Sequence, residues 1–247
     1  MNKLEDELRR NYLSGHSQYV SGTVYQNMRV LWPYFEENYA FLLDLSRDVK
    51  ILEIGSGSGS LIAWLADHGF SNLTGLDISQ QEVDRAKERG LPLVCADAHD
   101  YLKDLADSSI DVLIAKAVFE HMHKQDGADL LKAATRVLNQ QGGTVVLDVP
   151  NMDWVMSNHE RYMDLTHHVG YTRESLSQML RLYFDSVEVK GSLEPVESTF
   201  SWLRVRLVKP LVVRLLRFFF RIMGEGAANI LFESRSIVGV GKLGLSE

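Results

Sequence analysis

The 247-residue sequence contains a single cysteine, Cys95. One thiol cannot form an intrachain disulfide or a thiolate metal cluster, and this fits a reducing cytosol. The sequence also lacks a long uncharged apolar run, since no stretch reaches the ~18–20 residues that a membrane-spanning helix needs. The charged first ten residues have no apolar core of the kind found in a signal peptide. We therefore expect a cytoplasmic protein that is not integral to a membrane.

Positive charge is scarce as well. The 26 lysines and arginines are outnumbered by 33 acidic residues, which gives a formal net charge of −7. Such a chain has no overall basic field to attract a nucleic-acid backbone, so we expect no nucleic-acid partner, although a local basic patch is still compatible with this charge. With 45% hydrophobic residues the chain can bury the core of one domain.

Strand and helix patterns alternate through most of the chain. The predicted strands are 49–54, 73–77, 91–95, 110–115, 144–149, 186–190 and 236–242. The predicted helices are 60–68, one that starts at Ser79 with Glu82 at capping-box spacing, 127–138, and one that starts near Thr172. This alternation predicts an α/β fold with a doubly wound, mostly parallel seven-stranded sheet whose last strand is antiparallel. In such sheets the ligand lies beyond the carboxyl ends of the strands.

We predict one domain that spans residues 1–247. Its predicted parts are a helical cover at 1–45, a cofactor-binding core at 46–192, an amphipathic helical insertion at 193–233 and a last strand at 234–247.

The first predicted strand leads from Glu53 into a turn with glycines at every second position, Gly55-Ser56-Gly57-Ser58-Gly59. Glycines let the backbone approach a ligand closely, and the helix that follows presents unpaired N–H groups. The dinucleotide fingerprint requires glycine or alanine where Ser60 stands, which counts mildly against NAD. A carboxylate at Glu53 would repel a pyrophosphate and would suit a cofactor that carries an ammonium group.

Two more acidic residues follow predicted strands. Asp77 ends the second strand, where a carboxylate can accept hydrogen bonds from both ribose hydroxyls. Asp97-Ala98 follows the third strand and is placed to bind an adenine amino group. The alternative interpretation is that the glycines only form a tight turn and the acids only cap helices. The ordered set of three acids favours a site for a nucleoside cofactor instead.

Taken together, these motifs resemble the class I S-adenosylmethionine-dependent methyltransferase superfamily. The resemblance covers roughly residues 48–190, and it also includes Asp111-Val112-Leu113-Ile114 and Arg136-Val137-Leu138 before Gly142-Gly143. It implies S-adenosylmethionine as the cofactor, with Glu53 on the methionine amino group, Asp77 on the ribose and Asp97 on the adenine. The cofactor-binding residues that it implies are Glu53, Gly55, Ser56, Gly57, Gly59, Asp77, Ile78, Asp97, Ala98, Lys116 and Ala117.

Methyl transfer requires alignment of the acceptor and removal of a proton. The loop 161–172 resembles the Asp-x-Thr-His motif of methyltransferases encoded among glycan-assembly genes, which points to His167 as general base with Asp164 fixing its tautomer. His121, in a Glu-His dipeptide similar to that of small-molecule methyltransferases, is either a structural histidine or the base. The loop histidines could instead serve only hydrogen bonding. We expect no metal, because adjacent histidines such as His167 and His168 point in different directions.

Residues 203–223 are unusual in this acidic chain, because they contain six basic residues and no acidic one. Pro210 can begin a helix there. At 100° per residue Arg214, Arg217 and Arg221 share one face, and apolar residues cover most of the rest. The pattern predicts a helix that lies in the interface of an anionic membrane. The alternative is a core or dimer helix with a solvated basic edge.

The function that we expect is O-methylation of a hydroxyl on a glycan or lipid-linked saccharide, as in polysaccharide biosynthesis, by an enzyme peripheral to the inner face of the cell membrane. The alternatives are a methyltransferase for a lipophilic small molecule such as a quinone precursor, a non-catalytic member that binds the cofactor or only a partner through the basic helix, or an NAD-linked reductase. The sequence leaves the oligomeric state open.

Overall fold

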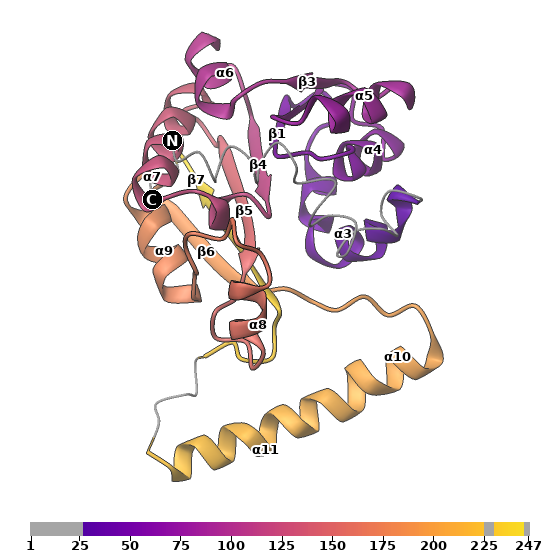
Figure 1. Ribbon diagram of the computed structural model, residues 1–247, viewed down its shortest axis with the longest axis vertical. Helices are drawn as coiled ribbons and strands as arrows, with labels where there is room; N and C mark the ends of the chain where they lie inside the picture. The colour runs from indigo at the N-terminus through magenta and orange to yellow at the C-terminus, as the bar shows by residue number, and fades with distance from the viewer. Residues whose placement is uncertain (1–26, 225–229, 245–247) are drawn as a thin grey trace.

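The computed structural model describes residues 27–224 and 230–244, and its centre is one seven-stranded sheet (Figure 1). The strands are β1 Ile51–Ile54, β2 Leu73–Asp77, β3 Leu93–Cys95, β4 Val112–Lys116, β5 Thr144–Pro150, β6 Ser186–Gly191 and β7 Ser236–Lys242. Their order across the sheet is β3-β2-β1-β4-β5-β7-β6, and β7 runs antiparallel to both of its neighbours. The predicted α/β fold, with its mostly parallel sheet and antiparallel last strand, is confirmed.

Helices cover both faces of the sheet (Figure 1). The described α-helices are α3 Trp32–Asn38, α4 Ser60–Asp67, α5 Gln80–Glu88, α6 Ala98–Asp104, α7 Lys124–Val137, α8 Ser157–Tyr162, α9 Arg173–Arg181, α10 Thr199–Leu203 and α11 Lys209–Ile222. The described 3₁₀ helices are η2 Met28–Leu31, η3 Ala40–Asp44 and η4 Phe119–His121, and η5 Arg204–Val208 is a π-helical turn. Of the predicted helical cover at 1–45, residues 1–26 lie outside the described part, and η2, α3 and η3 make up the rest.

The central strands are mostly apolar because side chains alternate between two buried faces. Leu52 of β1 packs in the cluster formed with α6, α7 and α9, whereas its neighbour Ile51 packs in the cluster formed with α3, α4 and α5. This two-sided burial produces the continuous hydrophobic runs from which the strands were predicted. The polar residues Glu53, Lys116 and Asp148 interrupt these runs near the carboxyl ends of three adjacent strands.

Several predicted boundaries need correction. β3 begins at Leu93 and not at residue 91, since Pro92 has no N–H group with which to extend the ladder. The fourth strand begins at Val112 and not at 110. Ser79 does precede α5, but its side chain makes no capping hydrogen bond, so the predicted capping box is wrong. The Ser79 backbone N–H donates instead to Asp77 Oδ1 at 2.8 Å.

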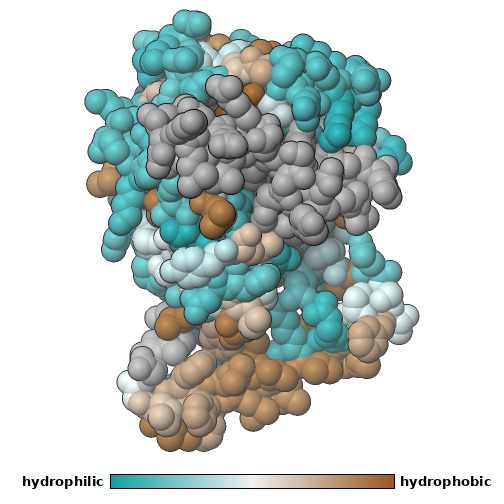
Figure 2. Space-filling view, viewed as in Figure 1, coloured by the Kyte–Doolittle hydropathy of each residue, from teal (hydrophilic) through white to brown (hydrophobic). Residues whose placement is uncertain are grey.

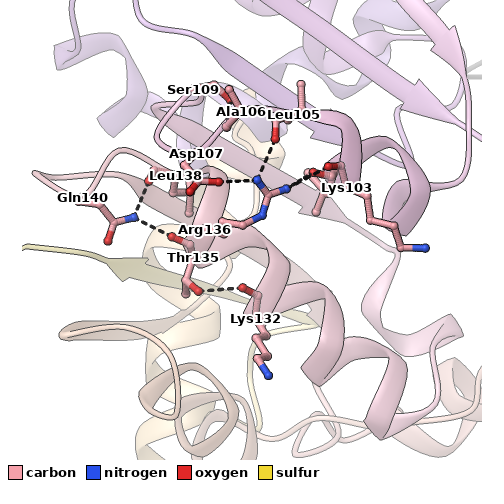
Figure 3. A network of polar contacts seen from close by, with 11 residues as sticks. Lys103, Leu105, Ala106, Asp107, Ser109, Lys132, Thr135, Arg136, Leu138 and Gln140 are labelled. Atoms are coloured by element: carbon pink, nitrogen blue, oxygen red, sulfur yellow. Dashed lines mark hydrogen bonds and ion pairs between the residues drawn. The ribbon is translucent and has the colours of Figure 1, made fainter.

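Arg136, which belongs to the methyltransferase resemblance, has a structural role at the end of α7 (Figure 3). Its guanidinium donates to the carbonyl oxygens of Leu102 and Leu105 and pairs with Asp107 at 2.6 Å. These carbonyls belong to the end of α6, where a helix has no internal donors for them. Arg136 therefore fixes α6 against α7, on the face of the sheet that the two helices share.

Residues 199–222 form one continuous helical arm, α10–η5–α11, that stands apart from the domain (Figure 1). The prediction that Pro210 begins the helix needs correction, since helical turns precede it. Pro210 cannot donate to a carbonyl one turn earlier, and the wider π turn η5 lies where that bond is missing, with Lys209 N–H donating to Arg204 O. No helix in the described part of the chain combines the length and apolarity needed to cross a bilayer.

Candidate active site at the carboxyl edge of the sheet

The turn after β1 depends on glycine for two different reasons. Gly55, Gly57 and Gly59 all have positive φ values, of 70°, 52° and 84°, which other residues rarely adopt. At Gly55 a Cβ would lie 2.3 Å from a methyl carbon of Val118, so there is no room for a side chain. At Gly57 a Cβ would meet no atom within 4 Å. The turn therefore packs tightly at its start and leaves open space in its middle, as a ligand that lies against the backbone requires.

Asp77, at the end of β2, holds this turn in place. Its Oδ2 accepts a hydrogen bond from Gly57 N–H at 2.8 Å and its Oδ1 accepts one from Ser79 N–H at 2.8 Å. Each carboxylate oxygen can accept a second hydrogen bond, so both remain able to bind ribose hydroxyls. Burial raises the pKa of Asp77, and the backbone donors lower it in part. The side chain is half-buried, beside the open space at Gly57.

Glu53 is a buried carboxyl group, and no cation of the described residues lies at hydrogen-bonding distance from it. Its side chain is 4% exposed, and among the described residues no donor lies within hydrogen-bonding distance of Oε2. Burial raises its pKa to about 8, an effect that nearby Lys116 reduces and Asp77 increases. A buried acid of this kind is costly unless a ligand satisfies it. An ammonium group beside the glycine turn would do so, which is what the α-amino group of S-adenosylmethionine offers.

The end of β4 places Lys116 and Ala117 opposite this turn. Lys116 Nζ lies 5.4 Å from the centre of the Tyr34 ring and lowers the pKa of both Glu53 and Glu120, so this lysine lies between the two buried acids. Ala117 has a φ of 54°, a left-handed conformation that costs an L-residue about 1–2 kcal/mol. Its N–H donates to Asp148 O at 2.8 Å, which helps to hold the strained residue. Such strain is typical of functional sites.

The adenine end of the predicted site lies after β3. Asp97 caps α6, since its Oδ1 accepts from His99 N–H at 2.8 Å and from Asp100 N–H at 3.2 Å, while Oδ2 takes no part in the cap. Ala98 is buried behind it. Ile78, directly after Asp77, is 54% exposed and offers an apolar surface beside these acids. The structure thus brings all the predicted cofactor-binding residues to one edge of the sheet, with Ser56 buried in the turn and bonded to Leu76 O.

Sequence reasoning missed a buried cluster beside this site. The hydroxyl groups of Tyr34 and Tyr39 both donate to Asp148 Oδ2, each at 2.8 Å, which ties the segment of α3 and η3 to the end of β5. Burial and the charge of Asp148 raise the pKa of both tyrosines. The one signal in the sequence is an acid within the otherwise apolar run 145–149. Tyr34 of this cluster packs against the side chain of Lys116.

The two histidines predicted to be catalytic lie together. The ring centres of His121 and His167 are 4.7 Å apart, edge to face. The Thr166 hydroxyl donates to Asp164 Oδ1 at 2.7 Å, so its oxygen accepts from His121 Nδ1 at 2.7 Å. His167 Nδ1 lies 2.9 Å from the carbonyl oxygen of Glu160, which can only accept. Both rings therefore carry a proton on Nδ1, and the lone pair of each neutral ring is on Nε2.

The loop that carries His167 is held firmly from two sides. Arg161 donates to the carbonyl oxygens of His167 and His168, the second at 2.9 Å. The backbone N–H groups of His168 and Val169 both donate to Glu120 O, at 2.7 and 3.1 Å. The carboxyl group of Glu120 is 3% exposed, and burial raises its pKa to about 8. These bonds hold His167 beside His121 and fix the loop to the backbone of Glu120.

Glu120, His121 and His167 also form the group in the described part of the chain that could hold a metal ion. One potential ligand atom of each lies within 4.8 Å of the others. This set combines His167 with the Glu-His dipeptide and not with its neighbour His168. Two imidazoles and a carboxylate suit several divalent metals, so the expectation that the site uses no metal stays a prediction and needs a direct test.

A family model described as a methyltransferase domain matches residues 52–147. EEF1A lysine methyltransferase 2 of Danio rerio is 35% identical over 82 residues, which cover 31% of this chain and 35% of that protein. Sterol 4-C-methyltransferase strm-1 of Caenorhabditis elegans is 32% identical over 136 residues, 52% of this chain and 40% of that protein. The chain thus spans well under two thirds of the length of these relatives.

Solved structures agree on the fold. A S-adenosylmethionine-dependent methyltransferase from Archaeoglobus fulgidus superposes with a TM-score of 0.65 at 21% identity and covers 94% of this chain and 99% of its own. The plantazolicin methyltransferase BpumL, solved with S-adenosylhomocysteine, gives a TM-score of 0.58 at 16% identity over 97% and 95% of the two chains.

Proposed function

We propose that this chain, in which residues 52–147 are a methyltransferase domain whose cofactor is S-adenosylmethionine, methylates a hydroxyl group of a glycan or lipid-linked saccharide. The observation that carries the cofactor part of the proposal is Glu53, a buried acid that pairs with no cation in residues 27–224 and 230–244. It lies beside a turn that is open at Gly57. Asp77 and Asp97, at the next two strand ends, suit a ribose and an adenine amino group. The cofactor supplies an activated methyl group, and the chain must bind it, orient the acceptor and accept a proton.

Calorimetry with S-adenosylhomocysteine tests the cofactor site. Wild type should bind, and Glu53→Gln and Asp77→Asn should bind at least tenfold more weakly, because each loses a hydrogen bond to a charged group worth about 1.5–3 kcal/mol. Absence of heat with wild type would favour a non-catalytic member that binds only a partner. Binding of reduced nicotinamide would favour a reductase. Mass spectrometry of candidate lipid-linked glycans after incubation with the donor then tests for the gain of one methyl group.

In this proposal His167 is the general base, and Asp164 and His121 support it. The Nδ1–H of His167 bonds to Glu160 O, which leaves Nε2 as the atom that can accept the hydroxyl proton. Asp164 acts through Thr166 on His121, whose ring touches that of His167. The subgroup of glycan-assembly methyltransferases rests on the resemblance of this loop.

Substitution of the loop histidines separates catalysis from folding. His167→Ala should abolish turnover while the affinity for S-adenosylhomocysteine stays near that of wild type. His168→Ala is the matched control from the same loop, since the His168 ring stacks on His123 at 4.1 Å. Unchanged turnover in His167→Ala would remove this residue from the mechanism and leave His121 as the candidate base.

A lipophilic small molecule is the second candidate acceptor. The exposed apolar arm favours it, and one relative is named as a sterol methyltransferase. A panel that contains lipid-linked saccharides and prenylated quinone precursors would distinguish the two, because the methyl group should appear on one class only.

We further propose that the arm holds the protein on the inner face of the cell membrane, with its apolar side in the lipid. The sequence predicts that the basic residues of the arm contact the membrane, but several of them form ion pairs with the body. Arg204 and Lys209 pair with Glu194 at 2.7 and 2.5 Å. Arg217 pairs with Glu233 at 2.9 Å. Figure 2 shows a band of hydrophobic residues along the outer side of the arm. Leu211→Ser/Leu215→Ser should abolish flotation with vesicles at low salt and leave S-adenosylhomocysteine binding intact; flotation equal to that of wild type would refute the attachment.

A further inference from the structure

A cavity of about 910 Å³ lies between the arm and the body of the domain. The arm contributes five cationic residues to its lining, namely Arg206, Lys209, Arg214, Arg217 and Arg221. The body and the segment that follows the arm contribute three carboxylates, Glu37, Glu194 and Glu233. The lining therefore has an excess of positive charge, in a chain whose formal net charge is −7. This local reversal of sign indicates an anionic ligand.

The ion pairs formed by the described residues of the cavity pair only part of that positive charge. Lys209 is occupied by Glu194, and Arg217 by Glu233. Arg206 lies 4.0 Å from Glu37, at the limit of an ion pair. In the part of the chain that the structure describes, Arg214 and Arg221 have no carboxylate partner. These two share the helix face that Arg217 occupies, seven residues or two turns apart, so their guanidinium groups line one side of the cavity.

An apolar strip of the arm that adjoins this basic face is exposed, and its residue Phe218 also lines the cavity. Five large side chains along it are 55–67% exposed, namely Leu207, Leu211, Leu215, Phe218 and Ile222. An interfacial helix buries its apolar face about 5–10 Å into the boundary between headgroups and acyl chains. A helix is about 10 Å across. When this strip lies in the membrane, Arg214 and Arg221, which flank it, are therefore at the level of the lipid headgroups.

The helix α3 has residues both at the cavity and beside the cofactor site. Glu37 lines the cavity, and Tyr34, one turn earlier on the same helix, lies beside Lys116 at the end of β4. An acceptor held in the cavity by its headgroup could thus extend along α3 towards the residues proposed to hold the methyl donor.

We propose that this cavity binds the doubly charged headgroup of a membrane lipid, either a terminal phosphate or a diphosphate, and that Arg214 and Arg221 recognise it. Guanidinium groups bind phosphate oxygens in a bidentate manner, with charge-assisted hydrogen bonds. The inference rests on the proposed function, since it assigns the phosphate to the lipid carrier of the acceptor. In this proposal the two arginines bind the phosphate of the headgroup, and the apolar residues of the arm lie in the membrane. Because the cavity lies beside α3, the group attached to the lipid would be held near the methyl donor.

Flotation with phosphatidylcholine vesicles that contain phosphatidic acid tests the proposal, with phosphatidylserine vesicles of equal surface charge as the reference. Wild type should bind the phosphatidic acid vesicles at least tenfold more tightly. Arg214→Gln/Arg221→Gln should lose this preference and bind both kinds of vesicle equally. Lys87→Gln/Arg181→Gln, which removes the same two charges from α5 and α9, should keep the preference. Equal binding of wild type to both vesicles, or an unchanged preference in the arm variant, would overturn the proposal.

Two further measurements separate the sources of failure. If inorganic phosphate at millimolar concentration displaces the protein from phosphatidic acid vesicles, the site is for a soluble phosphate and the lipid assignment is wrong. S-adenosylhomocysteine binding is measured on every variant. Loss of the vesicle preference with cofactor binding intact defeats only this inference, whereas a wild type that prefers phosphatidic acid but binds no cofactor defeats the proposed function.

Discussion

Glu53 makes the affinity for the cofactor depend on pH in a direction that the structure determines. Burial raises the pKa of this carboxyl group to about 8, so it is mostly protonated at neutral pH. The ammonium group of the ligand requires the carboxylate form. Binding must therefore remove a proton below pH 8, and the affinity should rise with pH until the carboxyl group is ionised.

The magnitude follows from the fraction of Glu53 that is ionised before binding. With a pKa of about 8, this fraction is about 1% at pH 6.0 and about a quarter at pH 7.5. An α-amino group with a pKa of about 7.8 begins to lose its own proton near pH 7.5, which reduces the gain slightly. S-adenosylhomocysteine should thus bind roughly 15–25-fold more tightly at pH 7.5 than at pH 6.0. At pH 7.0 binding should release about 0.8 proton.

Isothermal titration calorimetry in buffers of different ionisation enthalpy measures both quantities. Several histidines also titrate between pH 6.0 and 7.5, so Glu53→Gln is the necessary control. This variant should bind more weakly at every pH, with a nearly flat profile and little proton release. A flat wild-type profile, or an equal slope in the variant, would show that Glu53 does not hold the ammonium group.

Three other changes test separate parts of the site. Gly57→Ala should lower the affinity for S-adenosylhomocysteine by tenfold or more in calorimetry, because its Cβ would enter the open space and φ is 52°. Ala117→Gly should raise Tm by about 2–4 °C in a thermal scan, since it relieves roughly 1 kcal/mol of left-handed strain; an unchanged Tm would mean that the residue is not strained. Exhaustive treatment with EDTA should leave turnover unchanged, and a loss restored by added Zn²⁺ or Mg²⁺ would instead assign a metal to Glu120, His121 and His167.

Local sequence signals predicted most of the fold. The predicted bounds of β2 and β7 agree with the structure. The apolar run of β2 ends at an acid, Asp77, and that of β7 ends in a segment that contains glycine. The three acids at the strand ends could be placed at one edge because parallel topology brings carboxyl ends together. The capping box at Ser79 failed because Asp77, a residue of the preceding strand, supplies the hydrogen bond to the Ser79 backbone. A spacing rule cannot foresee such competition between neighbouring side chains.

Long-range contacts could not be predicted from the sequence. The bonds from Tyr34 and Tyr39 to Asp148 join residues more than a hundred positions apart, and no local pattern encodes them. The arm shows a second kind of limit. Helical periodicity places Arg214, Arg217 and Arg221 on one face, but it does not say whether this face points to solvent or to the body. The carboxylates of Glu194 and Glu233, which decide that orientation, belong to segments outside the arm.

Lys116 connects the cofactor site to the proposed base. It is the cation that lowers the pKa of both Glu53 and Glu120, two buried acids that would otherwise be still harder to ionise. When the ammonium group of the cofactor binds Glu53 and this acid ionises, the two new charges largely cancel. The sulfonium brings a further positive charge. That charge favours ionisation of Glu120, and the backbone oxygen of Glu120 anchors the loop that carries His167. Cofactor binding would thus raise the negative charge beside the histidine pair at the moment when a base is needed.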